Sequence, residues 1–117
     1  MTKEDKQLLL VDLCERVPYH PKGRVANART GAVYDEWLTC ATFPMFVNIT
    51  NNCRLYLRPM SSMTEEENKK LDEIWLKHTI EEGADYLNSI HVDYRGLIKK
   101  GLALEAPEGM YKMKEQQ

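Results

Sequence analysis

Long hydrophobic runs are missing from this sequence. Apolar stretches such as residues 8–11 are short, whereas a membrane-spanning helix needs about 18 consecutive apolar residues. Residues 1–5 include two acids, while a secretory signal has a basic start followed by a continuous apolar segment. We therefore expect a cytoplasmic protein that neither spans a membrane nor is exported.

Cysteine is scarce as well. The chain has three cysteines, Cys14, Cys40 and Cys53, so at least one is unpaired, and no two have the close spacing of a zinc half-site or a redox motif. Gly96 and Gly101 are too far apart for a phosphate-binding loop, and no serine has the flanking glycines of a nucleophile elbow. We expect free thiols in a reducing compartment, with no metal and no cofactor.

The composition of the 117 residues is that of an ordinary globular protein, with 43% hydrophobic and 29% charged residues. We expect a single globular domain over residues 1–111 and a flexible tail over residues 112–117. Thr2 and Asp5 resemble a helix N-cap pair, and apolar residues then recur at helical spacing. This pattern predicts a helix over residues 3–16, which the prolines at positions 18 and 21 end.

The middle of the chain has the pattern of β-structure, with short segments rich in β-branched and aromatic residues separated by glycine, proline and asparagine. The clearest predicted strand covers residues 53–58, and alternation over residues 45–49 predicts an antiparallel partner that reaches it through the Asn51-Asn52 turn. Residues 23–28 and 32–42 are weaker strand candidates, joined by a turn at Thr30-Gly31.

Helices are expected again after the strands. Thr64 and Glu67 form a capping box that predicts a helix with an inward stripe of Leu71, Ile74, Trp75 and His78, and with Gly83 as its end. Short helices are also expected over residues 85–91 and 93–100. The predicted fold class is therefore α+β, with a small antiparallel sheet of three to four strands flanked by an N-terminal helix and two to three C-terminal helices.

Charge is divided unevenly along the chain. Residues 16–64 hold six bases and two acids, which leaves a net charge of −6 on the rest. Arg54, Tyr56 and Arg58 share one face of the predicted strand, where guanidinium groups would hold phosphates and the ring would stack on a base. The alternative is that this face meets the protein's own acidic helix or water.

A second polar group comprises His91, Asp93, Tyr94 and Arg95. It could form a binding site for a small ligand or a partner, or Asp93 could simply cap a helical turn. Nucleophilic catalysis would need one of the three cysteines beside a histidine. Nothing in the spacing selects such a pair, and a structural role for the thiols is the simpler interpretation.

Three blocks of the sequence resemble a group of small uncharacterised proteins of Bacteroides-type gut bacteria. These blocks are YLRPMSSMTEEE at residues 56–67, DYRGLI at 93–98 with GLALEAPEGMY at 101–111, and DLC at 12–14 with Pro18-Tyr19. After the Pro-Tyr pair the group often has glycine, where this chain has His20. The resemblance implies origin from a prophage or mobile element, and it carries over no catalytic residue, because the group has no established activity.

These observations favour a non-enzymatic accessory protein of a phage or mobile element that binds another macromolecule. A protein partner is expected, and a nucleic-acid-binding module that uses Arg54, Tyr56 and Arg58 is the alternative. The rival class is a small hydrolase or transferase of unknown substrate.

Overall fold

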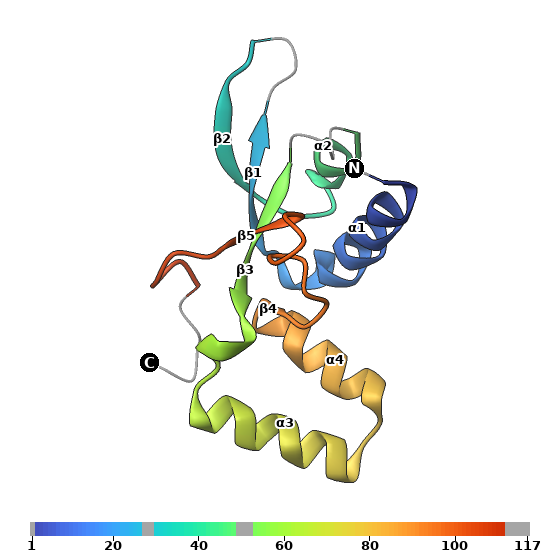
Figure 1. Ribbon diagram of the computed structural model, residues 1–117, viewed down its shortest axis with the longest axis vertical. Coiled ribbons are helices and arrows are strands. Elements are labelled where there is room, and N and C mark those ends of the chain that lie inside the picture. Colours follow the sequence, from blue (N-terminus) through green and yellow to red (C-terminus); the bar gives the residue numbers. More distant parts are fainter. Residues whose placement is uncertain (1, 27–29, 49–52, 112–117) are drawn as a thin grey trace.

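A computed structural model describes residues 2–26, 30–48 and 53–111 of the chain. The structure measures 48 × 32 × 26 Å along its principal axes. Figure 1 shows a β-hairpin at one end, a sheet with α1 and α2 beside it in the middle, and a pair of helices at the other end. The α+β fold class is thus confirmed, and the predicted tail over residues 112–117 lies outside the described residues.

Within the described residues the sheet has five strands. They are β1 (Lys22–Ala26), β2 (Val33–Trp37), β3 (Arg54–Pro59), β4 (Val92–Asp93) and β5 (Ala103–Glu105). The strand order is β2-β1-β3-β4, and β5 also pairs with β3. The predicted strand over residues 53–58 and the antiparallel pairing of the two weaker strand candidates are confirmed. The strand predicted over residues 32–42 is too long, since β2 ends at Trp37 and residues 40–42 form a turn, and residues 27–29 of the predicted hairpin lie outside the described residues. The sheet is mixed rather than antiparallel, because β4 and β5 both run parallel to β3.

The strand predicted over residues 45–49 is wrong. The chain forms a short helix there, α2 (Phe43–Asn48), and β1 takes the place beside β3, with Gly23 opposite Leu55. Proline is tolerated in the first turn of a helix, so Pro44 does not prevent this one. The turn before α2 is fixed by the backbone N–H of Phe43, which donates to the carbonyl of Thr39 at 2.8 Å. The predicted Asn51-Asn52 turn lies outside the described residues.

The predicted N-terminal helix is confirmed as α1 (Lys3–Arg16), with the Thr2–Asp5 capping box in place. A single 3₁₀ turn, η1 (Val17–Tyr19), follows and leads to His20, whose φ of 50° lies in the left-handed region. Glycine adopts this conformation without steric cost.

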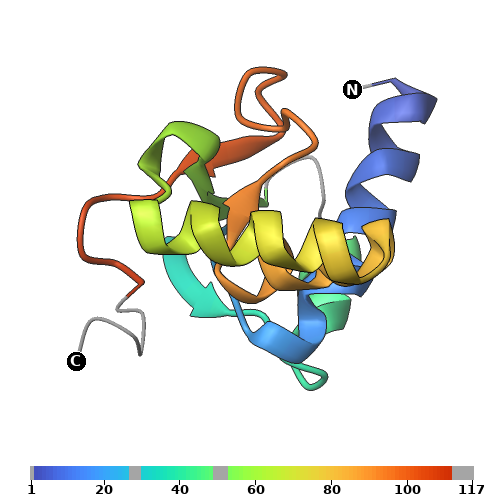
Figure 2. The ribbon, with the colours of Figure 1, turned by 90° about the horizontal axis from the view of Figure 1, so that it is seen from below.

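Two helices form a hairpin after β3. They are α3 (Glu65–Lys77), which starts at the predicted Thr64 capping box, and α4 (Ile80–Ser89), which starts at Thr79. Figure 2 shows α3 lying beside α4 at this end of the molecule. The prediction that Gly83 ends the first helix is wrong, since Gly83 lies within α4. A Cβ at Gly83 would lie 2.6 Å from Cδ1 of Trp75, so this position lets the indole cover α4 closely.

Three further details of the predicted helices differ from the structure. The helix predicted over residues 85–91 begins earlier, at Ile80. Residues 93–100 form the end of β4 and a series of turns instead of a helix, and Gly101 follows with a φ of 76°. In the predicted inward stripe only Leu71 is buried. Ile74 is half-buried, His78 is exposed, and Trp75 contacts α4 at Gly83 with about half of its surface exposed.

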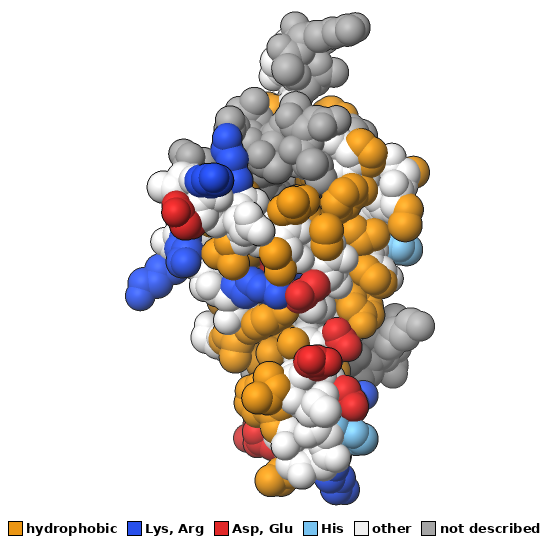
Figure 3. Space-filling view, turned by 90° about the vertical axis from the view of Figure 1, so that its right-hand side faces the viewer, with side chains coloured by type: hydrophobic (Ala, Val, Ile, Leu, Met, Phe, Trp, Pro, Cys, Tyr) orange, Lys and Arg blue, Asp and Glu red, His pale blue; other side chains and the backbone are white. Residues whose placement is uncertain are grey.

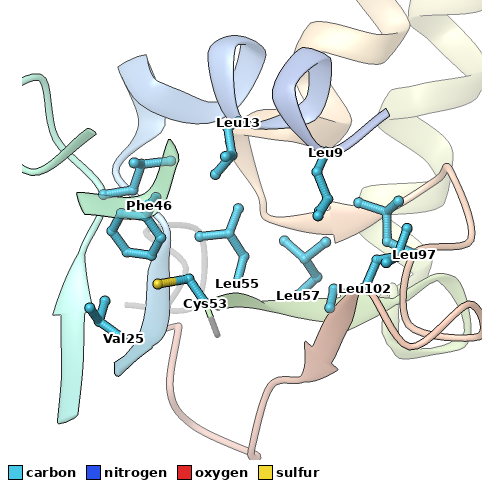
Figure 4. Close-up of a cluster of buried hydrophobic side chains, with 11 residues drawn as sticks. Leu9, Leu13, Val25, Phe46, Cys53, Leu55, Leu57, Leu97 and Leu102 are labelled. Carbon is cyan, nitrogen blue, oxygen red and sulfur yellow. The ribbon is translucent and has the colours of Figure 1, made fainter. Parts of the chain in front are cut away.

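Two hydrophobic clusters stabilise the fold. In the larger one α1 lies over the sheet, and Leu9 and Leu13 point toward Leu55 and Leu57 of β3 (Figure 4). The smaller one joins the helical hairpin to β4. Its buried members are Met63, Leu71, Leu87, Ile90 and Val92. Burial of this kind is the main favourable contribution to folding.

Gly23 allows the closest packing between the sheet and α2. A Cβ there would lie 2.6 Å from the Phe46 ring and 3.0 Å from the carbonyl oxygen of Arg54. We therefore expect Gly23→Ala to lower the free energy of unfolding by about 1–3 kcal/mol, the usual cost of overpacking a core. Urea denaturation measures this change.

A double-mutant cycle identifies the clash as the cause. In a Phe46→Leu background the cost of Gly23→Ala should be clearly smaller, because the ring atom that the new methyl group meets is gone. Equal costs in both backgrounds would show that the Phe46 ring is not what excludes a side chain at position 23.

Candidate functional site

The predicted residues Arg54, Tyr56 and Arg58 lie on the face of the sheet opposite α1. Directly paired residues point to the same side of a sheet, so the strand registers define this surface, which we call the open face. Its side chains are those of Lys22, Arg24, Ala26, Val33, Asp35, Trp37, Arg54, Tyr56, Arg58 and Leu104.

Tyr56 lies on the open face but is only 6% exposed. Its hydroxyl donates to Oδ1 of Asp35 at 3.0 Å and accepts a hydrogen bond from Nη2 of Arg24 at 3.0 Å. The guanidinium of Arg24 also lies 5.8 Å from the centre of the Tyr56 ring. The phenol thus ties β3 to β1 and β2, and its buried ring offers little surface for stacking.

Arg58 points toward the helical hairpin. Its Nη2 and Nη1 atoms donate to the two carboxylate oxygens of Glu67 at 2.7 and 2.9 Å. Burial alone would raise the pKa of Glu67, but the hydrogen bonds from Arg58 and Thr64 outweigh burial, and the pKa lies below its ordinary value. Arg58 therefore meets the protein's own acidic helix, as the alternative interpretation of this face expected.

Arg54 contacts backbone at the other end of β3. Its Nε donates to the carbonyl oxygen of Gly101 at 3.0 Å, and its Nη1 donates to that of Cys53 at 2.7 Å. These bonds tie the start of β3 to the turn that precedes β5. Arg54 stays half-buried at the border of the open face.

The contact between Arg58 and Glu67 generates a stability prediction. Glu67→Gln removes the charge that compensates a largely buried guanidinium, so we expect a loss of about 3 kcal/mol in the free energy of unfolding. Glu66→Gln makes the same chemical change at the neighbouring exposed position and should be close to neutral. Similar losses in the two variants, measured by urea denaturation, would contradict a structural role for the pair.

The second predicted group connects the loop after β4 to α1. The Asp93 carboxylate accepts from the backbone N–H groups of Leu97 and Ile98, both at 2.9 Å. Tyr94 donates its hydroxyl proton to Glu15 at 3.0 Å. Arg95 binds both Glu15 and Asp12, and its hydrogen bond holds the pKa of Glu15 below the ordinary value. These contacts explain the group as a structural link.

Arg16 and Asp12 complete this link, and sequence reasoning missed both. Arg16 is fully buried, with Nε 2.9 Å from Asp12 Oδ2 and Nη2 donating to the carbonyl of Val92 at 2.9 Å. Their i, i+4 spacing is that of a helical ion pair. The pair lies on the same side of α1 as Leu9 and Leu13. An acid and a base at helical spacing on the apolar side of a predicted helix were therefore the signal available in the sequence.

His91 lies in the interior beside Arg16. Its ring stacks on Tyr111 with 4.0 Å between the centroids, and the residue is 8% exposed. Burial, followed by the charges of Arg16 and Arg58, lowers its pKa from 6.5 to about 4. Among the described residues, Nδ1 of His91 and Nη1 of Arg16 have no hydrogen-bond partner. The imidazole is therefore neutral at pH 7.

The depressed pKa of His91 makes stability depend on pH. Between pH 6.5 and about 4 the unfolded chain takes up a proton at His91 that the folded chain does not, so stability falls as the pH drops through this range. Each unit costs about 1.4 kcal/mol. We expect His91→Asn to flatten this slope, because asparagine tolerates the positive φ of 64° at this position.

The measurement is urea denaturation from pH 7 to about 5.5, because below this range the unfolded chain begins to take up protons at Glu15 and Glu67, whose pKa values are lowered in the folded chain, and stability then also falls for that reason. The exposed His78 provides the control. If His78→Gln flattens the curve as much as His91→Asn, the pH dependence does not come from the buried imidazole.

A groove of about 510 Å³ lies between the turn after β3 and residues 105–111. Its lining residues are Arg58, Pro59, Ser62, Thr64, Glu105, Ala106, Pro107, Glu108, Gly109 and Tyr111. The charge of Arg58 is committed to Glu67. Tyr111, at the end of this segment, accepts from the N–H of Lys22 at 2.7 Å and donates to the carbonyl of Tyr56 at 2.6 Å. The segment is thus fixed to the first residue of β1 and to the middle of β3.

Among the described residues, the surroundings of the cysteines and histidines do not favour nucleophilic catalysis or metal binding. Cys14 and Cys40 are exposed, while Cys53 lies in the core and has its pKa raised by burial. The ring partner of His91 is a phenol, and Nδ1 of His78 faces Glu82 at 2.9 Å. Within the described part of the chain, no group of three or more acidic, histidine or cysteine residues could hold a metal ion.

The open face is most accessible where β1 and β2 pair. Trp37 is 44% exposed, and Nζ of Lys22, directly opposite on β1, lies 5.0 Å from its ring centroid. Arg24 is exposed beside them, and Val33 is exposed at the other end of β2. Sequence reasoning did not single out Trp37, although the alternation of Val33, Asp35 and Trp37 along one strand was the available signal.

Hydrophobic side chains are exposed elsewhere too. Figure 3 shows them spread over one face of the molecule, with charged groups between them. The most exposed among the described residues are Leu76 at 85% and Ile80 at 82%, around the turn between α3 and α4, while Leu10 and Val11 are half-exposed on α1. An exposed aromatic ring and basic groups coincide on the open face, which makes that face the better-defined candidate site.

Comparison of the chain with known protein families, curated proteins and solved structures found no match. Among the described helices, none is long and apolar enough to cross a membrane.

Proposed function

We propose that this protein is a non-enzymatic accessory protein of a phage or mobile element that acts in the cytoplasm by binding an acidic macromolecule through the open face. The observation that carries this proposal is the half-exposed indole of Trp37 with Lys22 and Arg24 beside it. The resemblance of residues 56–67, 93–98 and 101–111 to the group of small Bacteroides-type proteins supports the assignment to such an element.

The charge of the open face supports an acidic partner. Its described side chains include four bases and one acid, Asp35. Glu67 neutralises Arg58, and the remaining excess is positive, while the helical hairpin over residues 65–89 has eight acids and three bases. Complementary charge steers association and selects the partner. This division of charge favours binding of an acidic partner at the open face over binding at the helical hairpin.

The backbone around Trp37 supports a site that is formed before binding. Thr42 Oγ1 donates to the carbonyl of Trp37 at 2.6 Å, and the ladder between β1 and β2 includes the pair Lys22 and Trp37. Little ordering is then required when a partner arrives, and this reduces the entropic cost of association.

Heparin and poly-L-glutamate are suitable first probes, because both are polyanions and their backbones differ. We expect binding at low salt that weakens as salt is added, followed through the fluorescence of Trp37 in a Trp75→Phe background. Arg24→Glu should weaken binding about tenfold or more, because it reverses a charge at the site.

Lys69→Glu is the matched control, since it makes the same change of charge at an exposed position of α3, away from the open face. Circular dichroism checks that each variant is folded. The proposal fails if the wild-type chain binds neither polyanion at low salt, or if Lys69→Glu weakens binding as much as Arg24→Glu.

A further inference from the structure

We infer that the acidic partner is a single-stranded nucleic acid, with a base stacked on Trp37 and phosphates held by Lys22 and Arg24. This inference rests on the proposed function and adds the chemical class of the partner. The combination of an exposed ring with adjacent cations carries it, because single-strand binders join aromatic stacking surfaces to a basic path for the backbone.

The spacing of the three side chains suits a strand that runs along β1. Lys22 and Arg24 are alternate residues on one face of β1, so their Cα atoms are about 7 Å apart, comparable to the separation of successive phosphates in an extended strand. Trp37 lies opposite Lys22, and Nζ of Lys22 already lies 5.0 Å from the indole centroid. A base on the indole would therefore have its phosphate near this ammonium.

An exposed indole distinguishes a single strand from a duplex. Bases in a duplex are stacked on one another and present only their edges, whereas an unpaired base has a free face that can lie on Trp37. Farther along β2 on the same face, beyond Asp35, Val33 is 59% exposed and offers a second apolar contact. A flat sheet face of this kind can bind the splayed bases of a single strand, but it cannot easily enter the groove of a duplex.

An acidic protein segment also complements the charge of the open face, but it makes less use of the ring. Carboxylates gain their binding energy from Lys22 and Arg24 by charge and hydrogen bonds, and no stacking is then required of Trp37. The role of Trp37 therefore separates the two classes of partner experimentally.

The direct test measures fluorescence anisotropy of a labelled oligothymidylate of about 15 nucleotides, a length within the usual range of site sizes. Unlabelled duplex DNA of the same length and heparin serve as competitors. We expect the single strand to bind more tightly than the duplex, and Trp37→Ala to weaken its binding about ten- to a hundredfold, the range for loss of one stacked base. Heparin binding should change little in the same variant.

Trp75→Ala is the matched control, because Trp75 is 49% exposed, close to the value of Trp37, and lies on α3. It should leave oligothymidylate binding unchanged, with circular dichroism confirming that both variants are folded. In a Trp75→Phe protein, quenching of Trp37 fluorescence by the oligonucleotide would report the stacking directly.

The outcomes separate this inference from the proposed function. If heparin and poly-L-glutamate bind but the oligonucleotide binds no better than duplex, or if Trp37→Ala has no effect on it, the partner is an acidic protein or another polyanion and the inference is overturned. If no polyanion binds at all, the inference and the proposed function both fail.

Discussion

The guanidinium of Arg16 is completely buried, and the packing of α1 against β4 and the loop after it depends on how this charge is compensated. Asp12, one turn earlier on α1, accepts from both Arg16 and Arg95, while Arg16 also donates to the backbone of β4. A buried charge is tolerated only when it is paired and hydrogen-bonded. This network therefore fixes the position of α1 relative to β4 and to the loop that follows it.

The same principle joins the sheet to the helical hairpin. Glu67 is buried, accepts from the backbone N–H of Thr64 at the start of α3, and accepts from both Nη atoms of Arg58. One carboxylate thus caps the N-terminus of a helix and anchors it to β3. Several of the charged side chains, among them Arg16, Arg58 and Glu67, are thus paired inside the protein. The part of the open face around Trp37 remains accessible, with Arg24 exposed and Lys22 half-exposed.

Helix starts could be predicted from the sequence because a cap is a local contact. Thr2 with Asp5 and Thr64 with Glu67 are three residues apart, and both capping boxes are present. The alternation in β3 was equally informative, since Cys53, Leu55 and Leu57 all lie in the core. Alternation failed over residues 45–49, where burial of one ring, Phe46, was enough to hold a short helix against β1.

Residue types and their near neighbours therefore determined the α+β class, the capped helices and the strands β1, β2 and β3. The tertiary structure alone decided the parallel pairing of β4 and β5 with β3, the burial of Tyr56 and His91, and the exposure of Trp37. The physical reason is distance along the chain. Arg16 meets Val92 across 76 residues, and Arg95 meets Asp12 across 83, so no local pattern records which charges are paired inside and which remain open to a partner.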